Sequence, residues 1–123
     1  MNSIYPEKIA SLALQSLLAE LTATPKPGLI DRNNSGAHRD MDFFTMQKSA
    51  SVLIFQFLRL AEIGNRFHGN ASDLFIEIRK KGKIAEEVMF DATNGVNTHK
   101  GALFSLGVIC AAAGYLCKNG RLK

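Results

Sequence analysis

The sequence VLIFQFL at Val52–Leu58 is apolar on almost every side and decides how the whole chain is interpreted. A run of this kind suits a buried strand or a buried helix. The flanking residues continue the apolar pattern with a helical period, and the full segment is longer than strands usually are. The sequence therefore predicts a buried central helix over about Asp42–Ile63, ending at Gly64-Asn65, a common C-terminal stop.

Three further segments have the apolar periodicity of helices, and no stretch convincingly predicts a strand. They run from about Pro6 to Leu21, from near Ser72-Asp73 past Met89, and from Asn97-Thr98 to about Lys118. If the third helix is continuous, Gly82 costs it about 1 kcal/mol relative to alanine. The fold class is therefore all-α: a four-helix core in a single helical domain over residues 1–123. The residues expected in the core include Leu12, Phe43, Phe44, Phe55, Phe57, Phe75 and Met89.

The second and fourth helices are apolar nearly all round, which is unusual in a four-helix domain where each helix keeps one face in water. Something else should therefore cover them. The chain either forms a homo-oligomer through these helices or is the N-terminal part of a larger helical fold.

Composition narrows the class of protein. At 46% apolar residues the chain can form a core, which excludes disorder. The only membrane candidate, Gly101–Leu116, is shorter than a spanning helix needs, so we expect no membrane segment. Cys110 and Cys117 lie too far apart on one helix for a disulfide, which suits the cytoplasm. The net charge of +4 suits an anionic partner, but no nucleic-acid module is recognisable.

The first polar loop, TPKPGLIDRNNSGAHRDMD at Thr24–Asp42, is too long for an ordinary connection between helices. Grouped carboxylates can hold Mg²⁺ and leave other positions to phosphates and water. Alternatively, Asp40 or Asp42 caps the following helix and the other residues are solvated. The charged and titratable residues of this loop are Lys26, Asp31, Arg32, His38, Arg39, Asp40 and Asp42.

The second polar loop, DATNGVNTHKG at Asp91–Gly101, leads into a helix. A glycine-containing turn before a helix N-terminus presents free backbone N–H groups and the positive end of the helix dipole, which together attract anions. Lys100 adds a positive charge there. The glycine spacing is not that of a Walker A loop. The alternative is an ordinary helix start, with Asn97 or Thr98 as the N-cap.

Outside the loops the candidates are weaker. His68 is expected in a surface loop, and the basic group from Arg79 to Lys83 on a solvated helix face. Glu86 precedes Met89 by three residues, so the two share one side of a helix. That spacing predicts that one carboxylate faces inward.

The two loops together closely resemble the triphosphoribosyl-dephospho-coenzyme A synthase family. The resemblance rests on GAHRDMD at Gly36–Asp42 and GVNTHKG at Gly95–Gly101, in that order, and it extends over nearly the whole chain. It implies an all-helical, cytoplasmic transferase that uses ATP and 3′-dephospho-coenzyme A and releases adenine. The product would be the precursor of the prosthetic group of citrate lyase or malonate decarboxylase. Mg²⁺ is the implied cofactor, and family members continue with further helices.

The chemistry of glycosyl transfer assigns a role to each candidate within this resemblance. Breaking the bond between ribose and adenine requires an acid and a base, and the triphosphate must be held by cations, metal and backbone donors. We assign proton transfer to His38, His99 and Asp31. Phosphate contacts are assigned to Lys26, Arg32, Asn97, Thr98, Lys100 and Gly101, and metal binding to Asp40, Asp42 and Glu86. The alternative function is a helical nucleotide-binding or assembly module without turnover.

Overall fold

The computed structural model describes residues 5–22, 43–92 and 100–118, and these form four α-helices. The helices are α1 (Pro6–Thr22), α2 (Phe43–Arg66), α3 (Ala71–Ala92) and α4 (Lys100–Lys118). The described residues contain no strand, so the prediction of an all-α fold is confirmed and the strand interpretation of residues 52–58 is excluded. Helix α3 is continuous through Gly82.

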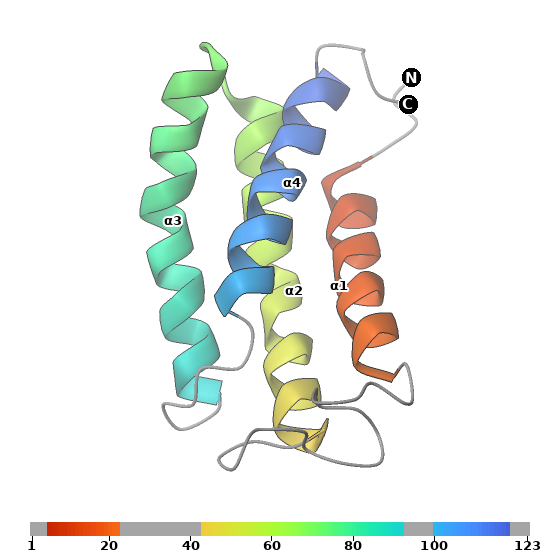
Figure 1. The fold of residues 1–123 in the computed structure, drawn as a ribbon. Coiled ribbons are helices and arrows are strands. Elements are labelled where there is room, and N and C mark those ends of the chain that lie inside the picture. Colours follow the sequence, from red (N-terminus) through yellow and green to blue (C-terminus); the bar gives the residue numbers. More distant parts are fainter. Residues whose placement is uncertain (1–4, 23–42, 93–99, 119–123) are drawn as a thin grey trace.

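The helices are arranged around a central pair, α2 and α4, with α3 on one side and α1 on the other (Figure 1). Helix α2 packs against each of the other three, and α1 and α3 do not contact each other in the described part of the chain. The core lies along α2. Its largest fully buried side chains are Leu53, Phe57, Met89 and Cys110. Burial of these apolar groups is the main favourable contribution to stability.

Glycines allow α2 and α4 to cross with their backbones almost in contact. A Cβ atom added to Gly64 would lie 1.9 Å from the carbonyl oxygen of Ala111, and one added to Gly114 would lie 2.2 Å from that of Ala61. Gly107 is also buried, and its added Cβ would lie 3.0 Å from Leu60. Any larger residue at Gly64 or Gly114 would push the two helices apart. We refer to this contact as the α2–α4 crossing.

The turn between α2 and α3 is fastened to the C-terminal end of α4. The Tyr115 hydroxyl donates to the Gly69 carbonyl at 2.7 Å, and Lys118 Nζ donates to the Phe67 carbonyl. His68 is exposed, as predicted, and its Nδ1 lies 3.1 Å from Lys118 Nζ. The side chain of Asn70 then caps α3 by accepting from the Asp73 amide at 2.9 Å. These bonds fix the end of the bundle at which α2 stops and α3 starts.

The structure corrects the predicted end of α2. The helix passes through Gly64 and Asn65 and ends at Arg66. Gly64 is buried against α4, and the Asn65 side-chain amide donates to the Gly114 carbonyl at 3.1 Å. The two residues that were interpreted as a stop signal are therefore contacts of the α2–α4 crossing.

The structure also corrects part of the predicted core. Phe57 is fully buried, but Phe55 is 70% and Phe44 is 73% exposed. Leu12 and Phe75 are exposed as well. Because α2 has neighbours on only part of its circumference, the apolar residues on its remaining side face solvent. The side chain of Phe43 lies outside the described residues.

Among the described residues, no helix combines the length and the apolar character needed to cross a membrane. Cys110 is buried, Cys117 is half-buried, and both thiols are free. Burial raises the pKa of the Cys110 thiol from 9.0 to about 11, and it also raises the pKa of Cys117. Both cysteines are therefore thiols rather than thiolates near neutral pH, with low nucleophilicity.

Candidate functional site

Four helix ends lie on the same side of the bundle, at the bottom of Figure 1. Helix α1 ends there at Thr22 and α2 begins there at Phe43, while α3 ends there at Ala92 and α4 begins there at Lys100. The two polar loops that carry the predicted site residues therefore attach to one end of the molecule. This is opposite the end that Tyr115 and Lys118 fasten.

Most of the predicted site residues lie outside the described parts of the chain. This is so for all three proton-transfer candidates, for most phosphate candidates and for two of the three metal candidates. These residues are Lys26, Asp31, Arg32, His38, Asp40, Asp42, Asn97, Thr98 and His99. Lys100 and Gly101 are the first residues of α4, so their backbone N–H groups belong to its first turn, which has no intrahelical acceptors. Their side chains are not described.

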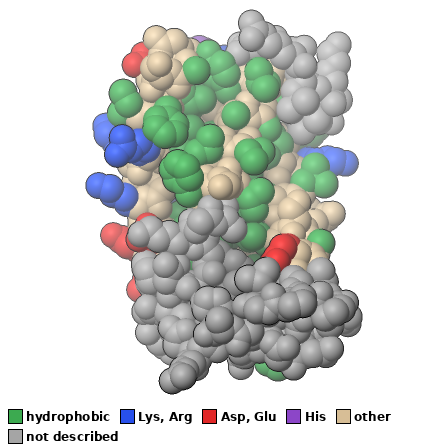
Figure 2. All heavy atoms as spheres, in the orientation of Figure 1, with side chains coloured by type: hydrophobic (Ala, Val, Ile, Leu, Met, Phe, Trp, Pro, Cys, Tyr) green, Lys and Arg blue, Asp and Glu red, His purple; other side chains and the backbone are tan. Residues whose placement is uncertain are grey.

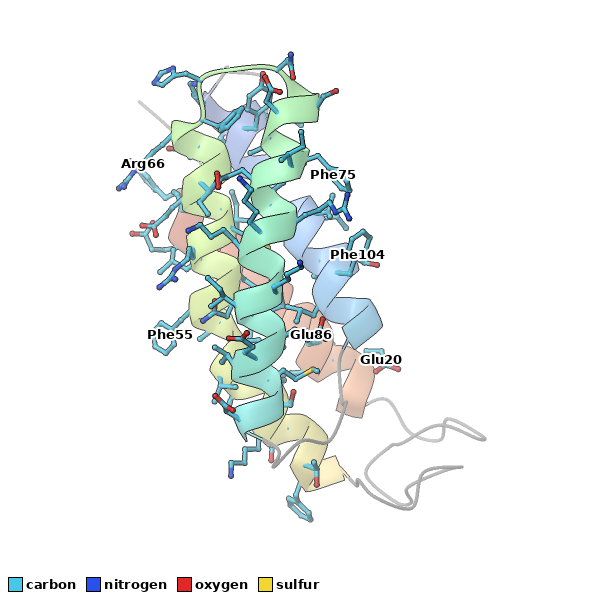
Figure 3. All side chains as sticks on the ribbon, turned by 90° about the vertical axis from the view of Figure 1, so that its left-hand side faces the viewer. Glu20, Phe55, Arg66, Phe75, Glu86 and Phe104 are labelled. Carbon is cyan, nitrogen blue, oxygen red and sulfur yellow. The ribbon has the colours of Figure 1, made fainter. Side chains whose placement is uncertain are left out.

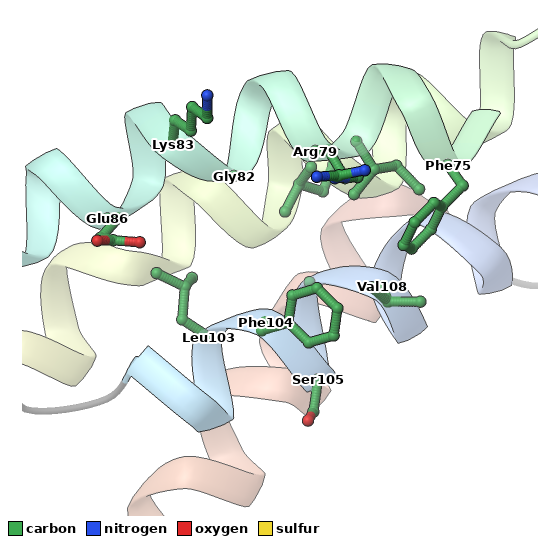
Figure 4. Close-up of a pocket in the computed structure, with 12 residues that line it drawn as sticks. Phe75, Arg79, Gly82, Lys83, Glu86, Leu103, Phe104, Ser105 and Val108 are labelled. Atoms are coloured by element: carbon green, nitrogen blue, oxygen red, sulfur yellow. The ribbon is translucent and has the colours of Figure 1, made fainter. Parts of the chain in front are cut away.

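Glu86 is the predicted site residue whose side chain the structure describes. It is half-buried on α3, and Met89, three residues later, is fully buried. The prediction that one carboxylate faces inward is thereby confirmed. Glu86 is turned toward α4, near the start of that helix (Figures 3 and 4). It therefore lies at the end of the bundle where the polar loops attach.

Glu86 forms one end of a groove of about 540 Å³ between α3 and α4, which we call the α3–α4 groove. Phe75 and Arg79 from α3, and Phe104 and Val108 from α4, line it farther from the loops (Figure 4). Its complete lining is Leu60, Phe75, Ile78, Arg79, Gly82, Lys83, Glu86, Leu103, Phe104, Ser105, Gly107 and Val108. The groove is mostly apolar, with two cations and one carboxylate.

Sequence reasoning missed this groove. It placed Arg79 and Lys83 on a solvated face, and both are indeed exposed, but they also line the groove. The one available signal was Gly82, a helix-interior glycine with a cost in stability and no evident purpose. What the sequence could not supply was the proximity of α3 to α4.

The described residues offer carboxylate oxygen but no complete metal cage. They contain no group of three or more His, Cys, Asp or Glu side chains arranged to hold a metal ion. Mg²⁺ is commonly bound through one or two carboxylates together with substrate phosphates and water, so a cage of protein ligands is not required. Glu86 is compatible with that chemistry, whereas Asp40 and Asp42 lie outside the described residues.

One known protein family matches the whole region that carries the helix ends, Glu86 and the α3–α4 groove. The family described as ATP:dephospho-CoA triphosphoribosyl transferase matches residues 6–123. The chain belongs to this family. The family resemblance drawn from the two polar loops is thus confirmed.

Individual relatives agree with the family match. The chain is 50% identical over 118 residues to a probable 2-(5''-triphosphoribosyl)-3'-dephosphocoenzyme-A synthase of Albidiferax ferrireducens, covering 94% of this chain and 38% of that protein. It is 48% identical over 118 residues to the protein of the same name in Streptococcus mutans, covering 92% and 40%. The 2-(5''-triphosphoribosyl)-3'-dephosphocoenzyme-A synthase of Haemophilus ducreyi is 44% identical over 111 residues, covering 89% and 34%. No solved structure matches the chain.

The chain spans about two fifths of the length of the first two relatives. Three fifths of each relative therefore have no counterpart in the matched region. The features described above, namely the four helix ends, Glu86 and the α3–α4 groove, belong to the part that is shared.

Proposed function

We propose that the chain acts in the transfer of the triphosphoribosyl group of ATP to 3′-dephospho-CoA, with release of adenine. The product is 2′-(5″-triphosphoribosyl)-3′-dephospho-CoA, the precursor of the prosthetic group of citrate lyase or, in a related branch, of malonate decarboxylase. Membership of the family across residues 6–123 is the observation that carries this proposal. The position of the four helix ends supports it, because both polar loops attach to one end of the bundle.

The reaction exchanges one bond at the anomeric carbon of the ATP ribose. The bond to the adenine nitrogen breaks, and a bond to a ribose hydroxyl oxygen of dephospho-CoA forms. The hydroxyl proton passes to a base, and the departing adenine takes a proton from an acid. Positive charge develops on the ribose in the transition state, so negative groups nearby lower the barrier.

The candidate residues divide between holding phosphate and moving protons. Lys26, Arg32 and Lys100 would neutralise the triphosphate, together with the backbone N–H groups of Asn97, Thr98 and Gly101, of which Gly101 lies in the first turn of α4. The proton donor and acceptor would come from His38, His99 and Asp31. A neutral imidazole is favoured at a helix N-terminus, which suits His99 as a base or hydrogen-bonding group.

Mg²⁺ is the proposed cofactor, and Asp40, Asp42 and Glu86 would hold it. When bound, it would neutralise part of the triphosphate charge. Glu86 contributes its carboxylate from a half-buried position on α3 near the start of α4, where a phosphate bound at that helix end would be close. The enzyme would be cytoplasmic, and its partners are ATP and 3′-dephospho-CoA.

A second function also has an observation in its favour. The matched region, which covers 38% to 40% of the first relatives, would then be a helical nucleotide-binding or assembly module without turnover. The two functions differ in one measurable product, free adenine.

The test combines the chain with ATP, Mg²⁺ and dephospho-CoA, follows adenine by chromatography, and measures ATP binding by calorimetry. Turnover predicts adenine and coenzyme product in equal amounts. ATP binding without adenine supports the module instead, and absence of ATP binding contradicts both functions.

The roles of single residues are tested in an active full-length relative. Replacing the residue that aligns with Asp40 or His99 by alanine should abolish adenine release. A matched control is the position of Lys80, which is exposed on α3 and does not line the groove. If release persists without the aligned carboxylate or imidazole, that residue has no catalytic role.

A further inference from the structure

The outward side of α4 is mostly apolar and largely exposed in the described part of the chain. This side, which we call the outer face of α4, consists of Phe104, Ser105, Val108, Ile109 and Ala112. Phe104 is 62% and Ile109 is 59% exposed. In Figure 2, hydrophobic side chains gather on the side of the molecule that α4 presents in Figure 1. Contiguous apolar surface of this kind marks an interaction site.

The outer face of α4 continues into the α3–α4 groove, where Gly82 leaves open space. A Cβ added to Gly82 would meet no atom of the described residues within 4 Å. A glycine inside a helix costs about 1 kcal/mol relative to alanine. Among the described residues, no contact at Gly82 offsets that cost.

Three other helix glycines, whose surroundings the structure describes, have a clear purpose. Gly64 and Gly114 let the backbones of α2 and α4 approach so closely that no Cβ would fit, and Gly107 is packed against Leu60. In this molecule, then, glycine within a helix marks a place where a second helix lies against it. Gly82 is the exception, because the place beside it is vacant.

The lining of the groove also indicates the charge of its occupant. Arg79 and Lys83 are exposed at its wall, and Glu86 is the single carboxylate among the lining residues. A second copy related by two-fold symmetry would present the same positively charged surface to itself. A helix that carries acidic residues beside its apolar face would be complementary to it.

We propose that the outer face of α4 and the α3–α4 groove bind an amphipathic α-helix that crosses α3 at Gly82 and places acidic side chains near Arg79 and Lys83. Its source is the part of the family fold that lies outside the matched region, which makes up about three fifths of the Albidiferax and Streptococcus relatives. The sequence is compatible with two ways of covering the apolar helices, namely a second copy of the chain or further helices of a larger fold. The open space at Gly82 and the positive charges of Arg79 and Lys83 favour further helices.

This docking has a consequence for the proposed active site. The groove runs from Glu86, near the loop end of the bundle, to Phe75 and Val108 (Figure 4). A helix seated in it would pass beside Glu86 and would cover that carboxylate from water on the groove side. Residues of the docked helix would therefore lie beside the end where the polar loops attach.

The test is co-expression of the full chain with the portion of the Albidiferax ferrireducens relative that does not align with it. Complex formation is measured by gel filtration with light scattering, and the dissociation constant by sedimentation. Gly82→Leu fills the crossing point and Phe104→Asp charges the outer face. Each should weaken the complex by about tenfold or more, the effect typical of central interface residues.

The matched control is Lys80→Leu, which places the same side chain as Gly82→Leu on the same helix. Lys80 is exposed on α3 and does not line the groove. The control should leave the dissociation constant within about twofold. Because all three positions are open to solvent, circular dichroism of each variant alone should retain the helical signal of the wild-type chain.

Other outcomes overturn the proposal. These are no complex with the wild-type chain, a complex that Gly82→Leu leaves unchanged, or self-association of the chain that Phe104→Asp abolishes. Binding of dephospho-CoA to the chain alone that Gly82→Leu weakens would assign the groove to a small molecule instead. None of these results depends on whether adenine is released.

Discussion

Helix α4 has two sides that carry similar residues and meet different surroundings. On the inner side Gly107, Cys110 and Gly114 lie against α2, and at Gly114 there is no room even for a methyl group. On the outer side Phe104 and Ile109 are exposed, and Gly82 across the groove has open space around it. The difference between the two sides of α4 indicates that glycine and apolar residues mark the helix faces that make contacts. This holds even where the described residues do not include the contact partner.

The largest expected effect comes from alanine at the α2–α4 crossing. In Gly64→Ala the new Cβ would lie 1.9 Å from the Ala111 carbonyl oxygen, which is backbone and cannot rotate away. The helices must separate, so we expect a loss of about 3 kcal/mol in the free energy of unfolding. This is the upper end of the usual range for substitutions that overpack a core. Urea denaturation followed by circular dichroism measures it.

Gly114→Ala is the companion variant, because its Cβ would lie 2.2 Å from the Ala61 carbonyl oxygen. It should be destabilising by a similar amount. If both variants were as stable as the wild-type chain, the close approach of α2 and α4 would be wrong, and with it the contrast between the two sides of α4.

A glycine-to-alanine substitution in the α3–α4 groove should change stability in the opposite direction. Gly82→Ala adds a methyl group at a place where no described residue lies within 4 Å, and it restores helix propensity to the middle of α3. We expect the free energy of unfolding to rise by about 1 kcal/mol. Thermal and urea denaturation of Gly82→Ala and Gly64→Ala, carried out in parallel, measure the change in the free energy of unfolding for each variant. A loss of stability would mean that the groove is closed in the free chain.

Sequence reasoning could predict the helices because their signals are local. Apolar residues with a helical period identified all four, and each predicted limit that falls on described residues agrees within about a turn. The end of α2 was wrong because Gly64-Asn65 is a common stop in isolation. Its role in the α2–α4 crossing depends on residues of α4 that lie 47 to 49 positions later in the sequence, and no local pattern contains that contact.

The exposure of Phe55 could not be predicted for a related reason. The run at residues 52–58 is apolar all round, so periodicity does not indicate which side faces the core. Phe57 is buried and Phe55 is not, because α1, α3 and α4 surround only part of α2. An apolar helix therefore predicts that contacts exist without predicting which of its sides makes them.

The candidate site was predicted from residue types and from the family resemblance. Spacing from Met89 correctly turned Glu86 inward, because both lie on one continuous helix. The α3–α4 groove was missed, since it joins residues 75–86 to residues 103–108 and exists only after the helices have packed. The roles of His38, His99 and Asp40 stay predictions, because these residues lie outside the described part of the chain.

The smallest expected effect is seen only at alkaline pH and concerns Cys110, on the inner side of α4. Burial raises the pKa of this thiol to about 11, whereas the unfolded chain ionises it near 9. A group whose pKa is raised by folding contributes stability below its unfolded pKa, and the contribution is lost as pH rises through the folded pKa. Stability should therefore fall between pH 9 and about 11, and Cys110→Ala should reduce that slope because it removes the buried thiol. Urea denaturation across this pH range measures the slope of stability against pH for the wild-type chain and for Cys110→Ala. Equal slopes would mean that the Cys110 thiol is hydrated, which contradicts its burial on the inner side of α4.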